Sequence, residues 1–181
     1  KNGPKPCMPK MINNISDCIH RNLFINDLIK TEYNIGRKIL VLGDRREYLN
    51  RTEKWIKENI NTNIVGQYVG GMKPSELRVS QEKDIILGTF SMASEGMDIP
   101  KLNTIILASP KSDIVQSVGR ILRQKKEHRV KHPYIIDIKD DISIFNNQYK
   151  KRLSHYSKNK YDITIINLDG TTEKYQNKNT K

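Results

Sequence analysis

The sequence predicts an α/β protein in which a doubly wound, mostly parallel sheet carries helices on both faces. Three observations support this class. Short apolar runs, typical of strands buried on both faces, alternate with longer segments whose apolar residues recur at helical spacing. Glycine, proline and aspartate lie where one kind of segment gives way to the other. The 181 residues are enough for one domain with a sizeable core.

In the first half of the chain, this pattern predicts three helices and two strands. Residues 11–33 carry apolar side chains at mostly helical spacing, and the polar residues and glycine after them end this helix. Asp44 follows an apolar run directly and is a credible N-cap for the next helix. We expect a helix over 11–33, a strand over 38–42, a helix over 45–61, a strand over 63–69 and a polar helix from about Pro74.

In the second half, further strands alternate with two more helices. Pro110 is well placed in the first turn of a helix, and a polar, lysine-rich tail follows Asp169. We expect strands over 84–88, 104–107, 132–137 and 161–168, a helix after Pro110 and a helix from Asp140 to about residue 151. Residues 1–10 then form a linker, 11–168 one domain, and 169–181 a disordered tail.

Composition limits the classes of partner. The chain has 32 Lys and Arg against 20 Asp and Glu, a net charge of +12 that favours polyanionic partners. It has no apolar run long enough to span a membrane. Its first residues lack an initiator Met and a signal-peptide core, and they resemble the cut end of a longer chain. Cys7 and Cys18 lack metal-site spacing, even with His20 nearby, so we expect reduced thiols in the cytoplasm or nucleus.

The segment from Gln116 to Arg123 is the most informative part of the sequence. On a helix, Gln116, Arg120 and Arg123 fall at i, i+4 and i+7, on one face. Apolar residues take most of the remaining circumference, and arginines on a largely buried helix need an anionic partner. A polyphosphate fits guanidinium best, and Gly119 would let it approach the backbone. The alternative is a surface helix whose arginines meet ordinary carboxylates.

A second segment, from Thr89 to Pro100, follows an expected strand. Thr89 can cap a short helix whose free N–H groups suit the phosphate of a nucleic-acid strand. Gly96 can end that helix in the left-handed conformation. The chain then turns so that Asp98 can point back to the ligand-binding cleft, where its carboxylate suits ribose hydroxyls. Taken singly, these residues could also be ordinary caps.

These two segments resemble motifs V and VI of superfamily 2 helicases, in the right order and register. The chain is therefore similar, over about residues 11–168, to the C-terminal RecA-like domain of these enzymes, and most like helicases of large DNA viruses and phages. The resemblance implies catalytic roles for Arg120 and Arg123, nucleotide binding by Gln116, Gly119, Gly96 and Asp98, and nucleic-acid binding by Thr89 and Ser91.

Two further segments complete the expected nucleic-acid surface. Arg45 and Arg46 follow the first strand in a segment that resembles motif IV. Cations in a first helical turn oppose the helix dipole, a small cost that is understandable if the helix start holds a nucleic-acid phosphate. The alternative is two solvated arginines. Gly43 stands where relatives often carry Ser. Gly70 and Gly71 resemble the glycines that lie near the bound strand in this family, although Gly-Gly is also ordinary turn chemistry. The basic loop 123–132 could extend this surface or be a solvated loop.

The sequence has neither a P-loop nor a DExx pair of carboxylates. The resemblance then implies that ATP and Mg²⁺ bind mainly to an N-terminal RecA-like domain of the same protein. This chain would supply its arginines across the cleft and bind a DNA or RNA backbone. We expect the isolated domain to be a monomer, without ATPase activity and without a membrane or a metal site of its own.

Two other functions stay open at this point. The chain could be a stand-alone basic domain that binds nucleic acid with its arginines on backbone phosphates and has no ATPase activity. It could also be a nucleotide-binding α/β enzyme of another class, with Asp98 on a ribose. The second is disfavoured because no glycine-rich loop follows the first strand.

Overall fold

The computed structural model describes residues 7–97, 99–115, 118 and 131–175. The chain divides into two compact units. The first comprises Lys1–Pro110 and Ile114–Ile138, and the second comprises Lys111–Asp113 and Lys139–Lys181.

The first unit is built on a five-stranded sheet with the strand order β2-β3-β1-β4-β5. Every pairing in it is parallel. The order places β1 at the centre, so the chain winds first to one side of it and then to the other, which confirms the expected doubly wound class. The strands are β1 (Ile39–Gly43), β2 (Val65–Tyr68), β3 (Ile85–Thr89), β4 (Thr104–Leu107) and β5 (Tyr134–Asp137).

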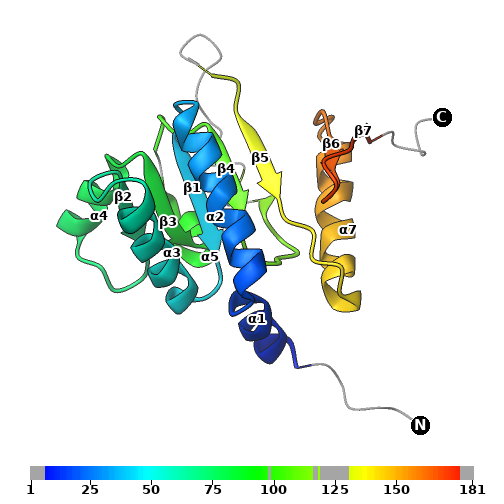
Figure 1. Ribbon diagram of the computed structural model, residues 1–181, viewed down its shortest axis with the longest axis horizontal. Helices are drawn as coiled ribbons and strands as arrows, with labels where there is room; N and C mark the ends of the chain where they lie inside the picture. Colours follow the sequence, from blue (N-terminus) through cyan, green and yellow to red (C-terminus); the bar gives the residue numbers. More distant parts are fainter. Residues whose placement is uncertain (1–6, 98, 116–117, 119–130, 176–181) are drawn as a thin grey trace. The chain divides into compact units, whose positions relative to one another are not determined.

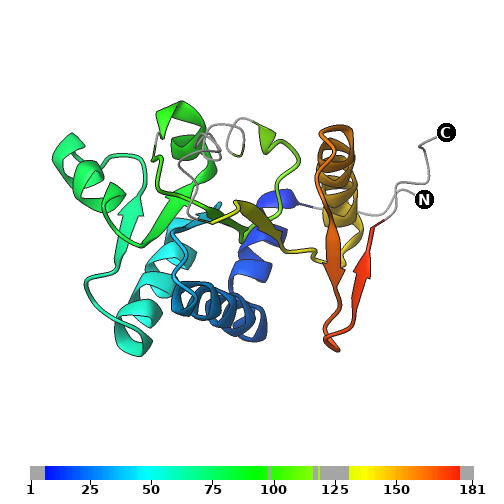
Figure 2. The same ribbon diagram turned by 90° about the horizontal axis from the view of Figure 1, so that it is seen from above.

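Helices cover both faces of this sheet (Figures 1 and 2). The helices of the first unit are α1 (Met8–Ser16), α2 (Ile19–Asn34), α3 (Arg46–Asn59), α4 (Pro74–Gln81) and α5 (Phe90–Gly96). Alternate residues of a strand point to opposite faces. Ile39 and Val41 therefore pack with Ile29 of α2 and Ile56 of α3, all four fully buried. Leu40 and Leu42 are equally buried on the other face, so β1 is apolar throughout.

The expected helix over residues 11–33 is wrong as a single element, because the structure has two helices there. α1 ends at Ser16 and α2 begins at Ile19. At the break, the Asp17 N–H bonds to Asn13 O at 3.0 Å, and the Asp17 carboxylate meets Arg51 Nη2 of α3 at 2.8 Å. α1 also begins inside the segment expected to be a linker.

The next helix begins one residue later than expected. Arg45, with extended backbone angles, takes the N-cap position of α3, and Asp44 precedes it. The prediction of Asp44 as N-cap is therefore wrong. Its carboxylate instead meets the Arg45 guanidinium at 3.1 Å, and its N–H donates to Ser109 Oγ at 3.0 Å.

The second unit contains α7 (Ser143–Lys158) and a two-stranded antiparallel hairpin of β6 (Thr164–Ile166) and β7 (Thr172–Lys174). The sequence predicted the helix and a strand over 161–168. It predicted a disordered tail where β7 forms, because the residues there are polar. The hairpin forms through its turn, where Gly170 has φ +83° and the Asp169 carboxylate accepts from the Thr171 N–H at 2.9 Å.

Candidate nucleic-acid interface at the carboxyl edge of the sheet

The strand register brings the predicted nucleic-acid residues to one edge of the sheet. Gly43 of β1 pairs with Thr89 of β3, and Tyr68 of β2 pairs with Gly88. The segments that follow these three strands therefore leave the sheet side by side, with the end of β3 between the other two. In parallel α/β sheets this carboxyl edge is where ligands bind.

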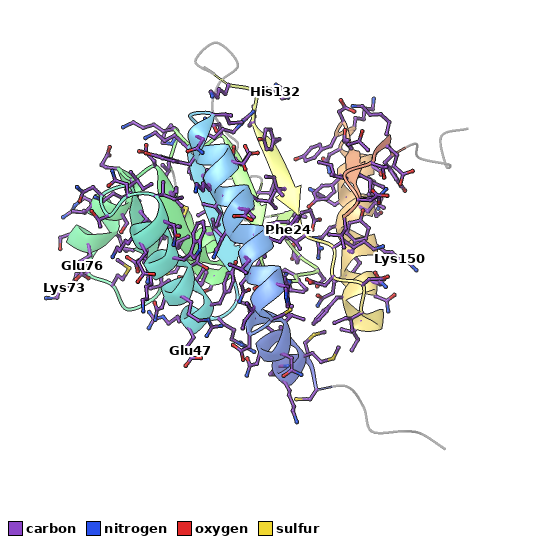
Figure 3. All side chains as sticks on the ribbon, in the orientation of Figure 1. Phe24, Glu47, Lys73, Glu76, His132 and Lys150 are labelled. Atoms are coloured by element: carbon purple, nitrogen blue, oxygen red, sulfur yellow. The ribbon has the colours of Figure 1, made fainter. Side chains whose placement is uncertain are left out.

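Arg46 connects two of these segments. It is an exposed residue in the first turn of α3, and its Nη2 donates to the carbonyl oxygen of Gly70, after β2. Gly71 has φ +83°, which favours glycine, and a Cβ added there would lie 3.8 Å from Arg46 Nη2. The structure thus joins the motif IV-like segment to the Gly-Gly segment. Glu47, labelled in Figure 3, is the acidic residue of the same helical turn.

Thr89 and Ser91 lie together at the end of β3. The Thr89 Oγ1 and Ser91 Oγ atoms are 3.2 Å apart, within hydrogen-bond distance. Thr89 occupies the N-cap position of α5, but its side chain makes no capping hydrogen bond, so the predicted cap is wrong. Its hydroxyl is directed to Ser91 instead. Ser91 is exposed and Thr89 is half-buried.

Arg45 differs from its neighbour because the protein already satisfies its guanidinium group. Nε donates to Asn13 Oδ1 at 2.6 Å, Nη2 donates to Pro9 O at 3.2 Å, and Nη1 meets Asp44 Oδ2 at 3.1 Å. Arg45 therefore fastens α1 to the start of α3. Asn13 lies 32 residues earlier in the chain, so no local sequence signal could have identified this contact.

Gly43 keeps the start of α3 close to β1. A Cβ added there would lie 2.9 Å from Leu49 Cδ2 and 3.0 Å from Tyr48 Cδ1, and both of these side chains are fully buried. The absence of the family's Ser at this position therefore has a packing reason. Ser109, after β4, offers a hydroxyl near the same strand end and accepts the Asp44 N–H. Ser109 was not among the site residues predicted from the sequence, although it follows an expected strand.

Most of the predicted nucleotide-binding residues are not covered by the structure. Gly96 is the last residue of α5, and the next residue, Met97, is extended with φ −64°, so the helix ends without the left-handed cap expected there. One turn of the helix after Pro110 is described, where the Val118 N–H donates to Ile114 O at 2.8 Å. The residues that lie outside the described ranges are Asp98, Gln116, Gly119, Arg120 and Arg123.

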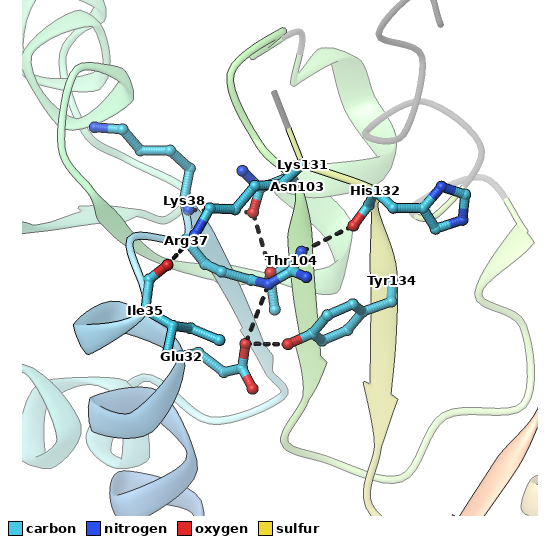
Figure 4. Close-up of polar contacts among 9 residues, drawn as sticks. All are labelled: Glu32, Ile35, Arg37, Lys38, Asn103, Thr104, Lys131, His132 and Tyr134. Carbon is cyan, nitrogen blue, oxygen red and sulfur yellow. Dashed lines mark hydrogen bonds and ion pairs between the residues drawn. The ribbon is translucent and has the colours of Figure 1, made fainter. Parts of the chain in front are cut away.

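A polar cluster at the opposite edge of the sheet was not foreseen (Figure 4). Tyr134 of β5 donates its hydroxyl to Glu32 of α2, and the Arg37 guanidinium lies 3.8 Å from the centre of the Tyr134 ring. Arg37 Nη1 donates to His132 O at 2.8 Å, and Lys131 Nζ donates to Ile35 O. Burial, then the hydrogen bond to Glu32, raise the pKa of the Tyr134 phenol well above its ordinary value. These contacts tie the end of α2 to the start of β5.

Two features are absent from the described residues. Within those ranges, no three His, Cys, Asp or Glu residues come together in a group that could hold a metal ion. In the same part of the chain, no helix combines the length and apolar character needed to cross a bilayer.

Comparison with known proteins identifies relatives. The family described as "Helicase conserved C-terminal domain" matches residues 20–125. A protein of Acanthamoeba polyphaga mimivirus, named "Putative ATP-dependent RNA helicase L396", is 42% identical over 180 residues, which are 98% of this chain and 34% of that protein. The similarly named QP509L of African swine fever virus is 32% identical over 95 residues, or 52% of this chain and 18% of that protein. The chain spans only 34% of the mimivirus relative's length.

Solved structures share the fold. T4 UvsW matches with a TM-score of 0.66 at 19% identity, covering 87% of this chain and 36% of that one. The DUF1998 helicase MrfA, bound to DNA and AMPPNP, matches with a TM-score of 0.58 at 21% identity, covering 77% and 20%. Domain 2 of the DEAD-box helicase Mss116p, bound to an RNA duplex, matches with a TM-score of 0.53 at 13% identity, covering 66% and 50%. The likeness confirms the expected RecA-like fold.

Proposed function

The chain belongs to the helicase conserved C-terminal domain family, and we propose that it is the C-terminal motor domain of an ATP-dependent superfamily 2 helicase or translocase. The observation that carries this proposal is the edge at which Arg46, Gly70, Thr89 and Ser91 come together. The 42% identity to a mimivirus protein with a helicase name supports the same function.

The carboxyl edge suits a nucleic-acid backbone. Arg46 offers a guanidinium group, Gly70 and Gly71 leave the backbone open to close approach, and the two hydroxyls add neutral donors. Among the described residues, no atom lies within 4 Å of a Cβ added at Gly70. Groups of this kind contact phosphates and sugars, so we expect binding to depend little on sequence and to weaken steeply with salt.

The ATP site would be shared with a domain outside this chain. In this proposal, Mg²⁺ and most nucleotide contacts belong to an N-terminal RecA-like domain of the full-length protein. Ile114 and Val118, each 1% exposed, fix the buried side of the helix after Pro110. On the helix that the sequence predicts here, Gln116, Arg120 and Arg123 would lie away from this side, as the proposal requires of residues that face a neighbouring domain. Bound ATP supplies the phosphoryl group whose charge these arginines would stabilise.

Nucleotide binding and nucleic-acid binding would be coupled, because residues of the two sites lie close together in the chain. Gly96 and Asp98 follow Thr89 and Ser91 by only a few residues, so one short segment would contact both nucleotide and nucleic acid. A shift of that segment when the cleft closes would move Thr89 relative to the contacts of the other domain. Alternate closing and opening of the cleft would move the nucleic-acid backbone along the protein.

The experiment is an Arg123→Ala substitution in the full-length protein. We expect ATPase activity stimulated by nucleic acid to fall by roughly 10³–10⁵-fold, as for other arginine fingers, with the thermal midpoint unchanged. Arg78→Ala, which removes an exposed arginine from α4, is the matched control and should keep full activity.

Other results would contradict the proposal. If Arg123→Ala lowered nucleic-acid affinity while ATPase activity persisted, the chain would be a binding domain that uses its arginines on backbone phosphates. If the 181-residue chain hydrolysed ATP by itself, the division of the ATP site between two domains would be wrong.

A further inference from the structure

The exposed face of α7, in the second unit, carries a row of cationic side chains. Among the described side chains of this helix, five are exposed, and none of them belongs to the site described above: Asn147, Lys150, Lys151, Ser154 and Lys158. Helical spacing gathers these residues within an arc of about 100° around the helix axis. Lys150, labelled in Figure 3, is one of them. This face, here called the lysine face, has three ammonium groups and no acidic or apolar side chain.

The buried side of α7 fixes the lysine face toward solvent. Phe145 and Arg152 are each 2% exposed, and Tyr156 is 6% exposed. All three lie about half a turn around the helix from the lysine face. The helix therefore could not turn its lysines inward without exposing two buried aromatic rings to water.

The lysines of this face are unpaired within the described part of the chain. Lys150, Lys151 and Lys158 form no ion pair and no side-chain hydrogen bond with another described residue. The 16 residues of α7 include no Asp or Glu, so the helix itself offers no carboxylate three or four residues away. The helix dipole favours Lys158 in the last turn, but Lys150 and Lys151 lie near the middle of the helix, beyond this effect. Their charges are available to an anionic partner.

The dimensions and chemistry of the lysine face fit a nucleic-acid backbone. Lys150 and Lys158 are separated by roughly 12 Å along the helix axis. One strand of duplex DNA presents a phosphate every ~3.4 Å of its axis, so about three phosphates span this length. Asn147 and Ser154 add neutral donors of the kind that also contact phosphates. A row of donors suits a repeating anion better than a single phosphate group.

The other polyanion that could meet such a face is an anionic membrane surface. A helix that lies in a membrane interface buries an apolar side among the lipids. The apolar side of α7 is already buried within the protein, at Phe145 and Tyr156. The lysine face itself has no apolar residue to insert, so its chemistry favours nucleic acid.

We propose that the lysine face of α7 is a second nucleic-acid surface of this chain, which binds backbone phosphates without reading the base sequence. The proposal rests on the proposed function, because it takes nucleic acid as the polyanion. It goes beyond that function, because none of its residues belongs to the carboxyl edge. It gives the second unit a share in holding the nucleic acid.

The experiment compares the 181-residue chain with a variant that carries Lys150→Gln, Lys151→Gln and Lys158→Gln. The probe is a labelled DNA duplex of mixed sequence with a single-stranded tail, and its anisotropy gives the affinity at several salt concentrations. Each lysine that contacts a phosphate contributes about 1 to the slope of log affinity against log salt. The slope should therefore become less steep by about 2–3. The thermal midpoint should not change, because glutamine is also a good helix former at exposed positions.

The matched control removes three lysines that already have carboxylate partners. Lys54, Lys101 and Lys174 each form an ion pair with a carboxylate, and their side chains are 64–77% exposed. Changing all three to glutamine lowers the net charge by the same amount but should leave the slope nearly unchanged. The comparison separates the lysine face from the net charge of the chain.

Arg46→Ala, measured beside these variants, tests the carboxyl edge separately and should make the slope less steep by about 1. If the lysine-face variant and the control change the slope equally, the lysine face is not a binding surface, whatever Arg46→Ala does. If the lysine-face variant lowers the slope and Arg46→Ala does not, the grip at the carboxyl edge is wrong and the lysine face stands. If the chain binds no DNA, both proposals are wrong.

Vesicles of phosphatidylcholine and phosphatidylserine test the membrane alternative. The lysine-face variant could lose vesicle binding while its salt dependence on DNA stays that of the wild type. That result would assign the face to an anionic membrane surface and overturn the proposal.

Discussion

At Gly43 the backbone of β1 leaves no room for a side chain, whereas at Gly70 it does. A Cβ at Gly43 would lie 2.9 Å from Leu49 Cδ2, a distance that requires the buried side chain to move. At Gly70 no atom of the described residues lies within 4 Å of an added Cβ, and the residue is exposed. Two glycines beside the same candidate surface therefore serve different purposes, one in packing and one in access.

This contrast predicts different costs for the same substitution. Gly43→Ala should lower the free energy of unfolding by about 1–3 kcal/mol, because it overpacks the junction between β1 and α3. Gly70→Ala should change it by less than about 1 kcal/mol. Urea unfolding of the two variants beside the wild type measures both effects. Equal effects of the two substitutions would show that Leu49 and Tyr48 relax freely.

At the scale of the secondary-structure elements, polar side chains join the end of α2 to the start of β5. Glu32 accepts from Tyr134, and Arg37 stacks on the same ring and pairs with Glu32 at 3.4 Å. β5 is an edge strand with half-buried residues, so apolar packing alone fixes it less firmly than β1. The three side chains supply the directional contacts that hold its start.

The Tyr134 hydrogen bond predicts a dependence of stability on pH. The pKa of Tyr134 is raised in the folded protein, mainly by burial and by Glu32, so folding favours the protonated phenol. Its contribution is therefore full below about pH 10, the ordinary phenol value, and is lost as the pH rises above it. Tyr134→Phe should be less stable than the wild type by about 1 kcal/mol near neutral pH, and this gap should narrow in alkali. Urea unfolding across this pH range measures the gap, and a constant gap would contradict the assignment.

At the scale of the whole molecule, the chain divides into two compact units, and one short segment belongs to a different unit from its neighbours in sequence. Lys111–Asp113 lies in sequence between β4 and the helix that begins near Ile114, yet it belongs to the second unit. Arg152 of α7, only 2% exposed, donates from Nη1 to Lys111 O at 2.6 Å. The second unit thus holds the segment that leads into the predicted arginine-bearing helix.

This contact predicts a local effect of a substitution in α7. Arg152→Ala should accelerate amide hydrogen exchange at residues 111–113 by roughly tenfold, the loss expected for a hydrogen bond from a charged group. Exchange in β1, within the first unit, should not change. Lys151→Ala, an exposed neighbour on the same helix, is the control. Equal protection of residues 111–113 in both variants would contradict this role for Arg152.

The sequence by itself determined the α/β class, the five strands of the main sheet and the segments after these strands as the place of the candidate site. These features follow from local information, because strand burial is visible in apolar runs and parallel strands end together. The break after Ser16 and strand β7 were missed, since apolar residues keep a helical spacing across the break and the residues of β7 are polar and exposed.

Tertiary structure alone decided which of two adjacent arginines fastens α1 to the start of α3 and which reaches Gly70. Arg45 and Arg46 look alike in sequence, but their partners lie 32 and 24 residues away. It also decided that Glu32 and Tyr134, 102 residues apart, meet at the opposite edge. Such contacts depend on strand order and on helix placement, which fix the distance between side chains that are far apart along the chain.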